Sequence, residues 1–398
     1  MKLSYPNFNN NTLKRVQQVL KSGRVNYWTG NECKEFEKEF SNYHNVKYSL
    51  TVSNGSVALE IALKALNLKK KDSVIVTPRS FVISASCVLN LGLKPVFADV
   101  DNNGNMSIDA IKKVYNKNVK AIIVVHLNGL PCDLDPILKF VKKNKVYLIE
   151  DCSQAHGAIY KNKKVGAFGH LSTWSFCQDK IISTGGEGGI ITTNNKKLWL
   201  KLWSLKEHGK NYKSVFYKKH KTGFRWLHDN LGSNYRMTEI QAIIGREQLR
   251  SLDKQIEKRN LISSIYLNGL KDYYQKNDII NKSDFRCQTC PLKKSNKSCN
   301  KCTHAFYRLN MFININKVKQ IELIKQFNKN NIDCSVGSCP EIYREKIFRK
   351  LKFYPKKRLP NAKLLGKTSI MFPINPYKSL MKIKSEINSI KKILNKYL

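Results

Sequence analysis

Acidic residues are scarce in this chain of 398 residues, which has 29 Asp and Glu against 71 Lys and Arg and a formal net charge of +42 at pH 7. The basic residues are scattered through surface-like stretches such as 69–71, 161–164 and 218–221 rather than gathered on one element. Net charge informs about solubility and non-specific binding rather than about fold. We therefore interpret the excess as compositional drift and expect no specific nucleic-acid partner, with a nucleic-acid-binding protein kept as the alternative.

Long apolar runs are also missing. The sequence has no stretch of about 18 apolar residues, the length that spans a membrane. Residues 1–16 lack the apolar run and small-residue cleavage site of a secretory leader. Several of the eleven cysteines lie in apolar runs, which a reducing compartment tolerates without disulfides. The sequence thus favours a cytoplasmic protein with no membrane partner.

The length of the chain exceeds the roughly 250–300 residues that one hydrophobic core usually serves. Its hydrophobic content of 41% and aromatic content of 10% are those of a globular protein. After about residue 250 the sequence changes to helical segments, a Cys-rich insertion and one strand-like run. We predict a large domain of residues 1–250 and a small C-terminal α+β domain of residues 251–398, with the insertion at 285–303.

Short apolar runs alternate with helix-period segments between residues 48 and 195. The strand candidates are 48–54, 73–78, 95–100, 121–129, 146–152, 172–177 and 188–193. Helix patterns lie between them, for example at 56–68 and 134–144. The alternation predicts an α/β fold with a mainly parallel sheet sandwiched by helices. Ligands of such sheets bind beyond the carboxyl ends of the strands, where Asn54, Asp151 and Ser175 are expected.

Lys180 follows a predicted strand and precedes a glycine-dense turn in the stretch WSFCQDKIISTGGEGGIITT, residues 174–193. Burial at this point would remove part of the hydration of the amine and lower its pKa, as a Schiff-base lysine requires. On spacing alone an ordinary surface lysine is the simpler interpretation. The assignment therefore depends on the motifs around it.

Asp151 closes the buried run VYLIEDC, and Gln154 and His156 follow shortly after it. A carboxylate at this position could keep a pyridine nitrogen protonated, which makes a cofactor ring an electron sink. The alternative is a helix cap, because an Asp at a strand end often accepts from the backbone amides that follow. His156 is more simply a packing residue than a catalyst.

The segment TVSNGSVALEIAL runs from a strand through a small-residue turn into a helix. The free amides and the hydroxyl at Gly55, Ser56 and Val57 would gather at the positive end of that helix, which suits a phosphate group. A turn of small residues before a helix is common, however, and is mostly structural.

These three elements, in this chain order, resemble the DegT/StrS family of sugar-nucleotide aminotransferases, which are fold-type-I pyridoxal phosphate enzymes. Further stretches of the resemblance are residues 23–40, 77–101 and 232–249, so that it covers nearly the whole chain. The resemblance implies an aspartate-aminotransferase-like fold and pyridoxal phosphate as the cofactor. It also implies a nucleotide-linked keto-sugar as one substrate and an amino acid, commonly glutamate, as the other.

The resemblance assigns roles at the cofactor ring. Lys180 looks like the lysine that carries the cofactor and moves the proton, and Asp151 like the partner of the pyridine nitrogen. Gln154 is similar to a residue that contacts the ring hydroxyl. Phe81 falls where the family places an aromatic side chain on the ring.

The resemblance also indicates which residues contact the phosphate group of the cofactor. Ser175 and the Gly55–Ser56 turn match phosphate contacts of the family. Asn234 matches an asparagine that reaches the phosphate from the neighbouring subunit, which implies a homodimer with shared active sites. Some relatives are pyridoxamine phosphate-dependent sugar dehydratases instead, and they carry His where Lys180 stands. The lysine therefore favours amino transfer, with the dehydratase kept as the alternative.

A cysteine cluster occupies residues 287–302, CQTCPLKKSNKSCNKC. Two Cys-x2-Cys pairs separated by eight residues suit a structural zinc site, although the gap is shorter than in the usual zinc ribbon. An iron–sulfur cluster, reduced thiols and an incidental disulfide are the alternatives. The predicted metal ligands are Cys287, Cys290, Cys299 and Cys302.

Four residues are candidates for substrate contacts. Ser338, Glu341 and Tyr343 lie in a segment where the small domain would approach the substrate, and each is equally compatible with a structural role. The guanidinium group of Arg236 has the planar geometry that binds a carboxylate or a diphosphate. An ion pair in the dimer interface is the alternative for this arginine.

Overall fold

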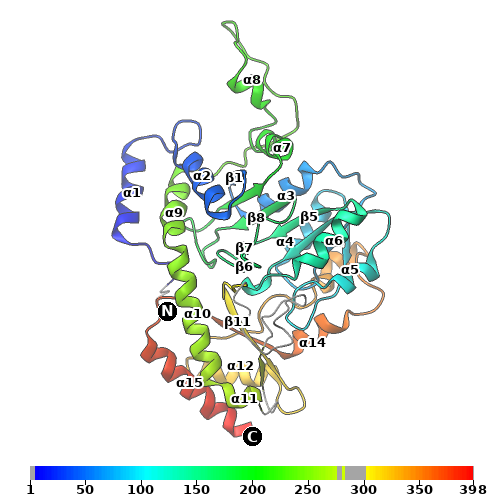
Figure 1. The fold of residues 1–398 in the computed structure, drawn as a ribbon, viewed down its shortest axis with the longest axis vertical. Coiled ribbons are helices and arrows are strands. Elements are labelled where there is room, and N and C mark those ends of the chain that lie inside the picture. Colours follow the sequence, from blue (N-terminus) through cyan, green and yellow to red (C-terminus); the bar gives the residue numbers. More distant parts are fainter. Residues whose placement is uncertain (1–4, 276–279, 283–301, 398) are drawn as a thin grey trace.

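A seven-stranded sheet forms the centre of the molecule in a computed structural model, which describes residues 5–275, 280–282 and 302–397 (Figure 1). In spatial order the strands are β1 (Tyr48–Val52), β9 (Gly189–Thr193), β8 (Leu171–Ser175), β5 (Tyr147–Asp151), β4 (Val119–Val125), β2 (Ser73–Val76) and β3 (Lys94–Phe97). Strand β9 is antiparallel to both β1 and β8, and the pairs from β8 to β3 are parallel. These strands coincide, to within a few residues, with the seven apolar runs, so the mainly parallel sheet is confirmed.

Both faces of the sheet are buried, which explains why its strands are apolar at consecutive positions. In β4, Ile122 and Val124 belong to one hydrophobic cluster while Ile123 belongs to the other, because successive side chains of a strand point to opposite faces. The helices of the first cluster are α2 (Glu32–His44), α5 (Ile108–Val114), α6 (Leu134–Asn144) and α9 (Glu239–Arg250). The helices of the second are α3 (Gly55–Ala65), α4 (Ile83–Asn90) and α7 (Lys196–Lys206). The predicted layer of helices on each face is therefore confirmed.

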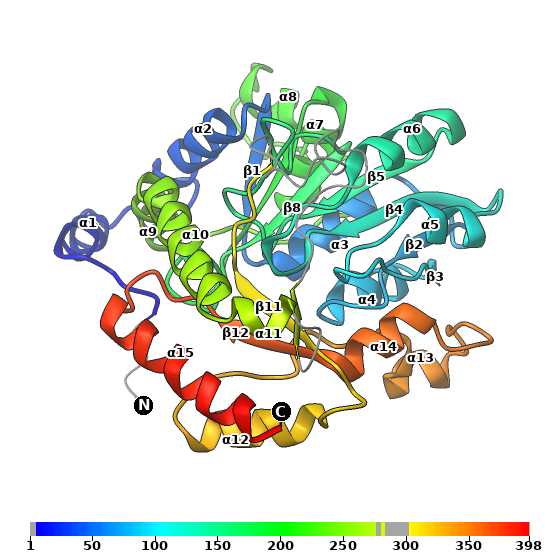
Figure 2. The same cartoon turned by 60° about the horizontal axis from the view of Figure 1, so that its bottom comes forward.

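The C-terminal part of the chain builds a smaller antiparallel sheet with its own core. The sheet consists of β10 (Ile280–Lys282), β11 (Arg308–Ile313) and β12 (Ser369–Pro373). The helices of this part are α10 (Leu252–Gly269), α11 (Lys271–Gln275), α12 (Gln320–Lys329), α14 (Pro360–Thr368) and α15 (Leu380–Leu394). The short helix α13 (Lys346–Lys350) instead packs its Phe348 in the second core of the central sheet. Figure 2 shows α12 and α15 below β11 and β12, on the side away from the central sheet. This arrangement confirms the smaller α+β part.

Helix α10 connects the two parts. Its residues Leu252 and Ile256 pack in the first core of the central sheet, whereas Ile262 and Tyr266 pack in the core of the small sheet. The domain division proposed at residue 250 lies close to this change of core. None of the helices among the described residues is long and apolar enough to cross a membrane.

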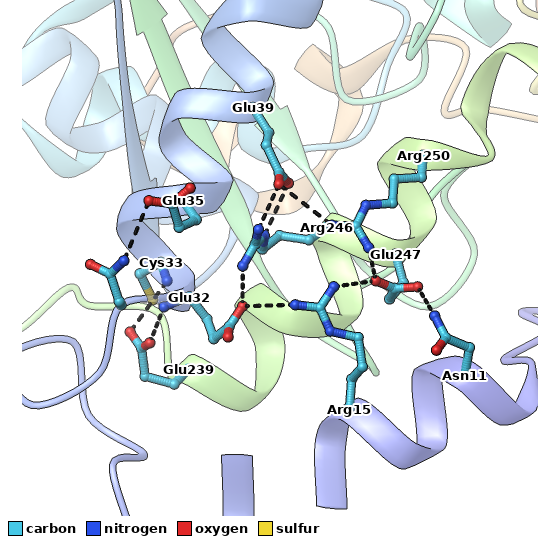
Figure 3. A network of polar contacts seen from close by, with 11 residues as sticks. Asn11, Arg15, Glu32, Cys33, Glu35, Glu39, Glu239, Arg246, Glu247 and Arg250 are labelled. Atoms are coloured by element: carbon cyan, nitrogen blue, oxygen red, sulfur yellow. Dashed lines mark hydrogen bonds and ion pairs between the residues drawn. The ribbon is translucent and has the colours of Figure 1, made fainter. Parts of the chain in front are cut away.

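The N-terminal helix α1 (Asn10–Lys21) is attached to α2 and α9 by a network of ion pairs (Figure 3). Arg15 Nη1 lies 2.6 Å from Glu247 Oε1 and Arg15 Nη2 lies 3.8 Å from Glu32 Oε2. Arg246 contacts Glu32 and, through two nitrogens, Glu39. Partly exposed pairs contribute about 0–1 kcal/mol each, so the network orients α1 more than it stabilises the fold.

The remaining short elements belong to connections. They are η1 (Leu127–Gly129), β6 (Ile159–Tyr160), β7 (Lys163–Lys164), α8 (Tyr212–Phe216), η3 (Ile342–Arg344) and η4 (Asn395–Tyr397). The segment that carries α8 extends away from the rest of the molecule at the top of Figure 1.

Candidate active site

A cavity of about 540 Å³ lies at the carboxyl ends of β5 and β8, where the sequence predicts the ligand. Its wall is built by the turn between β1 and α3, the segment before α4, the ends of β5 and β8, and the start of β11. The predicted site residues that line it are Gly55, Ser56, Phe81, Asp151, Gln154, Ser175, Lys180 and Ser338. The fold thus brings together residues that are far apart in the sequence, such as Gly55 and Ser338, which are 283 positions apart.

The Lys180 amine is largely buried, with 16% of its side chain exposed. Its Nζ lies 3.2 Å from Asp179 Oδ1 and donates to the Tyr307 hydroxyl at 3.4 Å. Burial lowers the pKa of this lysine, as expected, but Tyr307 and the Asp179 carboxylate outweigh burial, and the net pKa is raised. The expected net lowering of the Lys180 pKa is therefore wrong for this arrangement, because the sequence argument did not include the two neighbours.

Tyr307, Asp179 and Arg308 also line the cavity and were not among the predicted site residues. Asp179 precedes Lys180 directly, and Tyr307 and Arg308 lie at the start of a strand that the sequence did predict. Their positions, next to Lys180 and at the start of a predicted strand, were therefore the one feature that could have identified them as site residues. Nothing in their local pattern distinguished them from other polar residues at the ends of strands.

Asp151 is the last residue of β5 and is 3% exposed. Its Oδ2 accepts from the Ser84 hydroxyl at 2.9 Å and its Oδ1 accepts from the Ser153 amide at 3.2 Å. No helix follows β5 before α7 starts at Lys196, so the alternative of a helix cap is wrong. The two hydrogen bonds instead orient a buried carboxylate at the edge of the cavity.

Gln154 is held by the backbone of η1. Its Oε1 accepts from the Asn128 amide at 2.7 Å, and Asn128 adopts a left-handed conformation with φ of 57°. With the carbonyl oxygen occupied, the amide nitrogen is the group of Gln154 that remains to donate at the cavity wall. His156, two residues further on, is fully buried between Trp174 and Phe176, with ring centroids 5.3 and 5.5 Å away. Burial lowers the pKa of His156 well below its ordinary value, so it is a neutral packing residue.

The turn before α3 approaches the end of β8 very closely. A Cβ atom on Gly55 would lie 2.6 Å from Ser175 Cβ, so only glycine fits there. The Asn54 side chain caps α3 and accepts from the Val57 amide at 2.9 Å. The Val57 amide is therefore already satisfied, and Val57 does not line the cavity. We correct the expected phosphate turn to Gly55 and Ser56, with Ser175 opposite.

Phe81 is an aromatic residue of the cavity wall, and 67% of its surface is exposed. An apolar ring with this much exposure is free to cover a planar ligand. Ser338 also lines the cavity, and its contact with the substrate stays a prediction.

Arg236 does not line the cavity and its expected substrate contact is not supported. Its Nη1 donates to Glu207 Oε2 at 2.8 Å, and Trp28 Nε1 donates to the same oxygen at 2.9 Å. Glu207 is fully buried, so it requires a cation close by. This internal ion pair accounts for Arg236 without a substrate.

Glu341 and Tyr343 are likewise structural and lie outside the cavity wall. The Glu341 carboxylate accepts from Arg358 Nε at 3.0 Å, from a second nitrogen of Arg358 and from the Tyr343 hydroxyl. Tyr343 in turn accepts from the Leu359 amide at 3.0 Å. Both candidates fix the segment that follows Ser338, and these hydrogen bonds account for them without a substrate.

Asn234 is exposed and does not line the cavity of its own chain. Its Oδ1 accepts from the Arg236 amide at 3.3 Å. This position is compatible with the expected contact to a second subunit.

The predicted metal ligands Cys287, Cys290 and Cys299 lie outside the described residues. Cys302 is half-buried and its Sγ accepts from the Lys161 amide at 3.4 Å. A different group, formed by His126, Glu150 and Cys152, has metal-ligand geometry in the buried core. However, Glu150 already accepts from three backbone amides, from the Ser172 hydroxyl and from His126, so this group is a structural network.

Comparison with known proteins gives the family of the chain. Residues 6–391 match the DegT/DnrJ/EryC1/StrS aminotransferase family. The X-ray structure of the aminotransferase from Psychrobacter cryohalolentis superposes with a TM-score of 0.93 at 40% sequence identity, covering 99% of this chain and 98% of that one. An uncharacterised protein of Methanocaldococcus jannaschii is 32% identical over 388 residues, which are 96% of this chain and 95% of that protein. GDP-perosamine synthase of Escherichia coli O157:H7 is 38% identical over 247 residues, or 62% of this chain and 65% of that protein.

The fold and the cavity therefore define a pyridoxal phosphate-dependent aminotransferase of the type that acts on sugar nucleotides. The chain belongs to the DegT/DnrJ/EryC1/StrS aminotransferase family. The residues present fit the cofactor that this family implies. Gly55, Ser56 and Ser175 line the cavity at the N-terminus of α3, where a phosphate group would be held, Asp151 offers a buried carboxylate, and Phe81 offers an exposed aromatic face.

Proposed function

We propose that the protein moves an amino group from an amino acid, with glutamate as the donor, to a nucleotide-linked keto-sugar, and that Lys180 carries the pyridoxal phosphate. The observation that carries the proposal is the single cavity where the ends of β5 and β8 meet the turn before α3. Lys180, Asp151, Gly55, Ser56 and Ser175 all line this cavity. The relative named GDP-perosamine synthase supports a nucleotide-linked sugar as the acceptor.

Each residue contributes one physical function. The bound cofactor supplies an electron-withdrawing ring that stabilises negative charge on the substrate carbon. Asp151, oriented by Ser84 and Ser153, keeps the ring nitrogen protonated. Lys180 takes the proton from the substrate carbon and returns it, as a positioned general base and acid. The amides of Gly55 and Ser56 at the N-terminus of α3 bind the phosphate.

The experiment that tests amino transfer is product analysis by mass spectrometry with a nucleotide-linked keto-sugar and isotopically labelled glutamate. We expect the labelled nitrogen in the sugar product, and no product with Lys180→Ala. A product that has lost a hydroxyl group and gained no nitrogen would instead establish the alternative, a sugar dehydratase. The presence of lysine rather than histidine at position 180 favours the transferase.

We also propose a homodimer in which Asn234 reaches the cofactor phosphate of the second subunit. The segment around α8 supports this proposal. It extends from the body of the molecule (Figure 1), and it carries exposed apolar side chains. Phe224 is 78% exposed, Trp226 87% and Leu231 88%. Exposed apolar residues gathered in one segment mark a protein interface.

A mixing experiment tests the shared site. Lys180→Ala and Asn234→Ala should each be inactive as purified, and unfolding and refolding them together should restore part of the activity. The restored fraction comes from mixed dimers in which one of the two sites has both native residues. No recovery on mixing, or a monomer in light scattering, would contradict the shared site.

We further propose that the four cysteines of the insertion hold a structural zinc ion, with the Cys-x2-Cys spacing as the support. Metal analysis of the purified protein should give one zinc per chain, and the Cys287→Ser variant should lose it. A protein that folds and loads cofactor without bound metal would contradict this assignment.

A further inference from the structure

The Lys180 amine has two polar neighbours that the proposed function does not use. Asp179 Oδ1 lies 3.2 Å from Lys180 Nζ, and the Tyr307 hydroxyl lies 3.4 Å from it. The Tyr307 hydroxyl also donates to Asp179 Oδ2. The amine, the phenol and the carboxylate therefore form a closed triangle of contacts.

The two neighbours come from different parts of the fold. Asp179 lies in the loop after β8, whereas Tyr307 directly precedes β11 of the small sheet. The backbone on both sides is fixed. The Tyr5 hydroxyl donates to the Lys180 carbonyl, and the buried Arg259 guanidinium donates to the Phe306 carbonyl at 3.2 Å. The triangle is therefore held in place by the surrounding structure and is not an incidental surface contact.

Two other charged groups of the cavity wall, Arg308 and Glu187, contact the triangle or its neighbours, and Arg308 Nη2 donates to the Tyr307 hydroxyl at 3.5 Å. Arg308 Nη2 lies 3.6 Å from Asp179 Oδ2 and its guanidinium lies 4.8 Å from the Tyr307 ring centroid. Glu187, in the same loop as Lys180, contacts the Cys177 thiol at 3.7 Å.

Two further titratable groups lie close to the site, Asp151 on the cavity wall and His156 in the core near Lys180. The Asp151 carboxylate is bound by Ser84 and Ser153, and His156 is neutral. Among the residues that the structure describes, Asp179 and Tyr307 are therefore the ones that contact Lys180 Nζ.

We propose that Asp179 and Tyr307 are positioning residues that hold Lys180 as an ammonium ion before the cofactor is loaded, and that they set the pH above which its amine becomes nucleophilic. A carboxylate at this distance favours the charged form of an amine. Only the neutral amine can form a bond to the aldehyde carbon of the cofactor. Loading of the cofactor is then controlled by the charge on Asp179.

The proton has a defined path when the ammonium is neutralised. One N–H bond of Lys180 breaks and the Tyr307 oxygen accepts the proton, while the phenol proton moves to the Asp179 carboxylate. Asp179, whose side chain is 48% exposed, then releases the proton to water. The amine and the phenol end neutral, and the carboxylate returns to its ionised form.

The test is made on the cofactor-free protein, although the inference rests on the proposed role of Lys180. Competitive labelling of amines with acetic anhydride, quantified on the Lys180 peptide by mass spectrometry between about pH 6 and pH 11, follows the fraction of neutral amine. The Asp179→Asn variant should move this labelling profile to lower pH by about 1–3 units. Tyr307→Phe should move it in the same direction by less, because the carboxylate remains.

The matched control is Glu187→Gln, which removes a carboxylate from the same cavity wall without touching the amine. Its Lys180 profile should coincide with that of the wild type. The proposal is overturned if the Asp179→Asn profile also coincides with the wild type, or if Glu187→Gln moves the profile equally.

Failure of the proposed function has a different signature. If pyridoxal phosphate gives the same absorption spectrum with wild type and Lys180→Ala, then Lys180 does not carry the cofactor, whatever the labelling shows. A wild-type band that requires Lys180, together with an unshifted Asp179→Asn labelling profile, overturns only the role of Asp179.

Discussion

The Gly55→Ala substitution tests the phosphate turn. The added Cβ would lie 2.6 Å from Ser175 Cβ and 3.2 Å from Ser175 Cα, whereas carbon atoms in ordinary contact are about 3.5–4.0 Å apart. The start of α3 and the end of β8 must therefore separate by roughly 1 Å. Loss of one hydrogen bond to a charged phosphate costs about 1.5–3 kcal/mol, which weakens cofactor binding by about 10–100-fold.

Titration of the purified variant with pyridoxal phosphate, followed by absorbance, measures this loss. The matched control is Gly92→Ala at a surface turn, where φ is 68° and the nearest atom to the new Cβ is 3.9 Å away. Because alanine is unfavourable at this positive φ, the free energy of unfolding of the control should fall by about 1–2 kcal/mol, but the control should bind the cofactor with wild-type affinity. Equal cofactor affinity of Gly55→Ala and wild type would refute the assignment of the turn to the phosphate.

Three further substitutions test the structural corrections. Glu150→Gln replaces a carboxylate that accepts five hydrogen bonds and leaves at least two donors unpaired, so urea unfolding should show a loss of about 2–6 kcal/mol. Arg236→Ala leaves the buried Glu207 without its closest cation, so the free energy of urea unfolding should fall by about 3–5 kcal/mol. A rise in KM for the sugar nucleotide at unchanged stability would instead support a contact of Arg236 with the substrate. Gly166→Ala has φ of 83° and places a Cβ 2.2 Å from Trp174, so its midpoint of thermal unfolding should fall, and an unchanged midpoint would contradict the packing described.

The pH dependence of stability follows from Glu150. Burial raises the pKa of this carboxyl, but His126 and the amides of Gly169 and Gly166 outweigh burial and hold the pKa below its ordinary value. The stability that Glu150 contributes is therefore fully present above its unfolded-state pKa and is lost as the pH falls through the folded-state pKa. The difference in urea-unfolding free energy between wild type and Glu150→Gln, followed by circular dichroism, should therefore shrink as the pH falls. A difference that grows toward low pH would show that this sign is wrong.

Much of the fold was predictable because it depends on local patterns. The seven buried strands are apolar at consecutive positions, and a helix pattern such as that of residues 134–144 repeats its apolar side chains at helical spacing. The site residues at the ends of β1, β5 and β8 followed from the rule that ligands bind at the carboxyl edge of a parallel sheet. Asp151 and Ser175 belong to this group, since both line the cavity. Lys180 was assigned by the resemblance to the family instead, because its spacing alone favoured an ordinary surface lysine.

The corrections concern interactions between residues distant in sequence. Arg236 is paired with the buried Glu207, and Glu341 is paired with Arg358, which no local pattern reveals. The raised pKa of Lys180 depends on Tyr307, a residue 127 positions away. The sequence identifies a charged side chain, whereas only the fold shows which charge lies opposite it.

The most direct test of the central claim is the visible absorption spectrum of the protein with pyridoxal phosphate, before and after glutamate, beside Lys180→Ala. The account predicts a band of lysine-linked cofactor in wild type that glutamate converts to the pyridoxamine form, and that borohydride fixes covalently to Lys180. The same band in Lys180→Ala, or no band in wild type, would contradict the assignment of Lys180 as the residue that carries the cofactor.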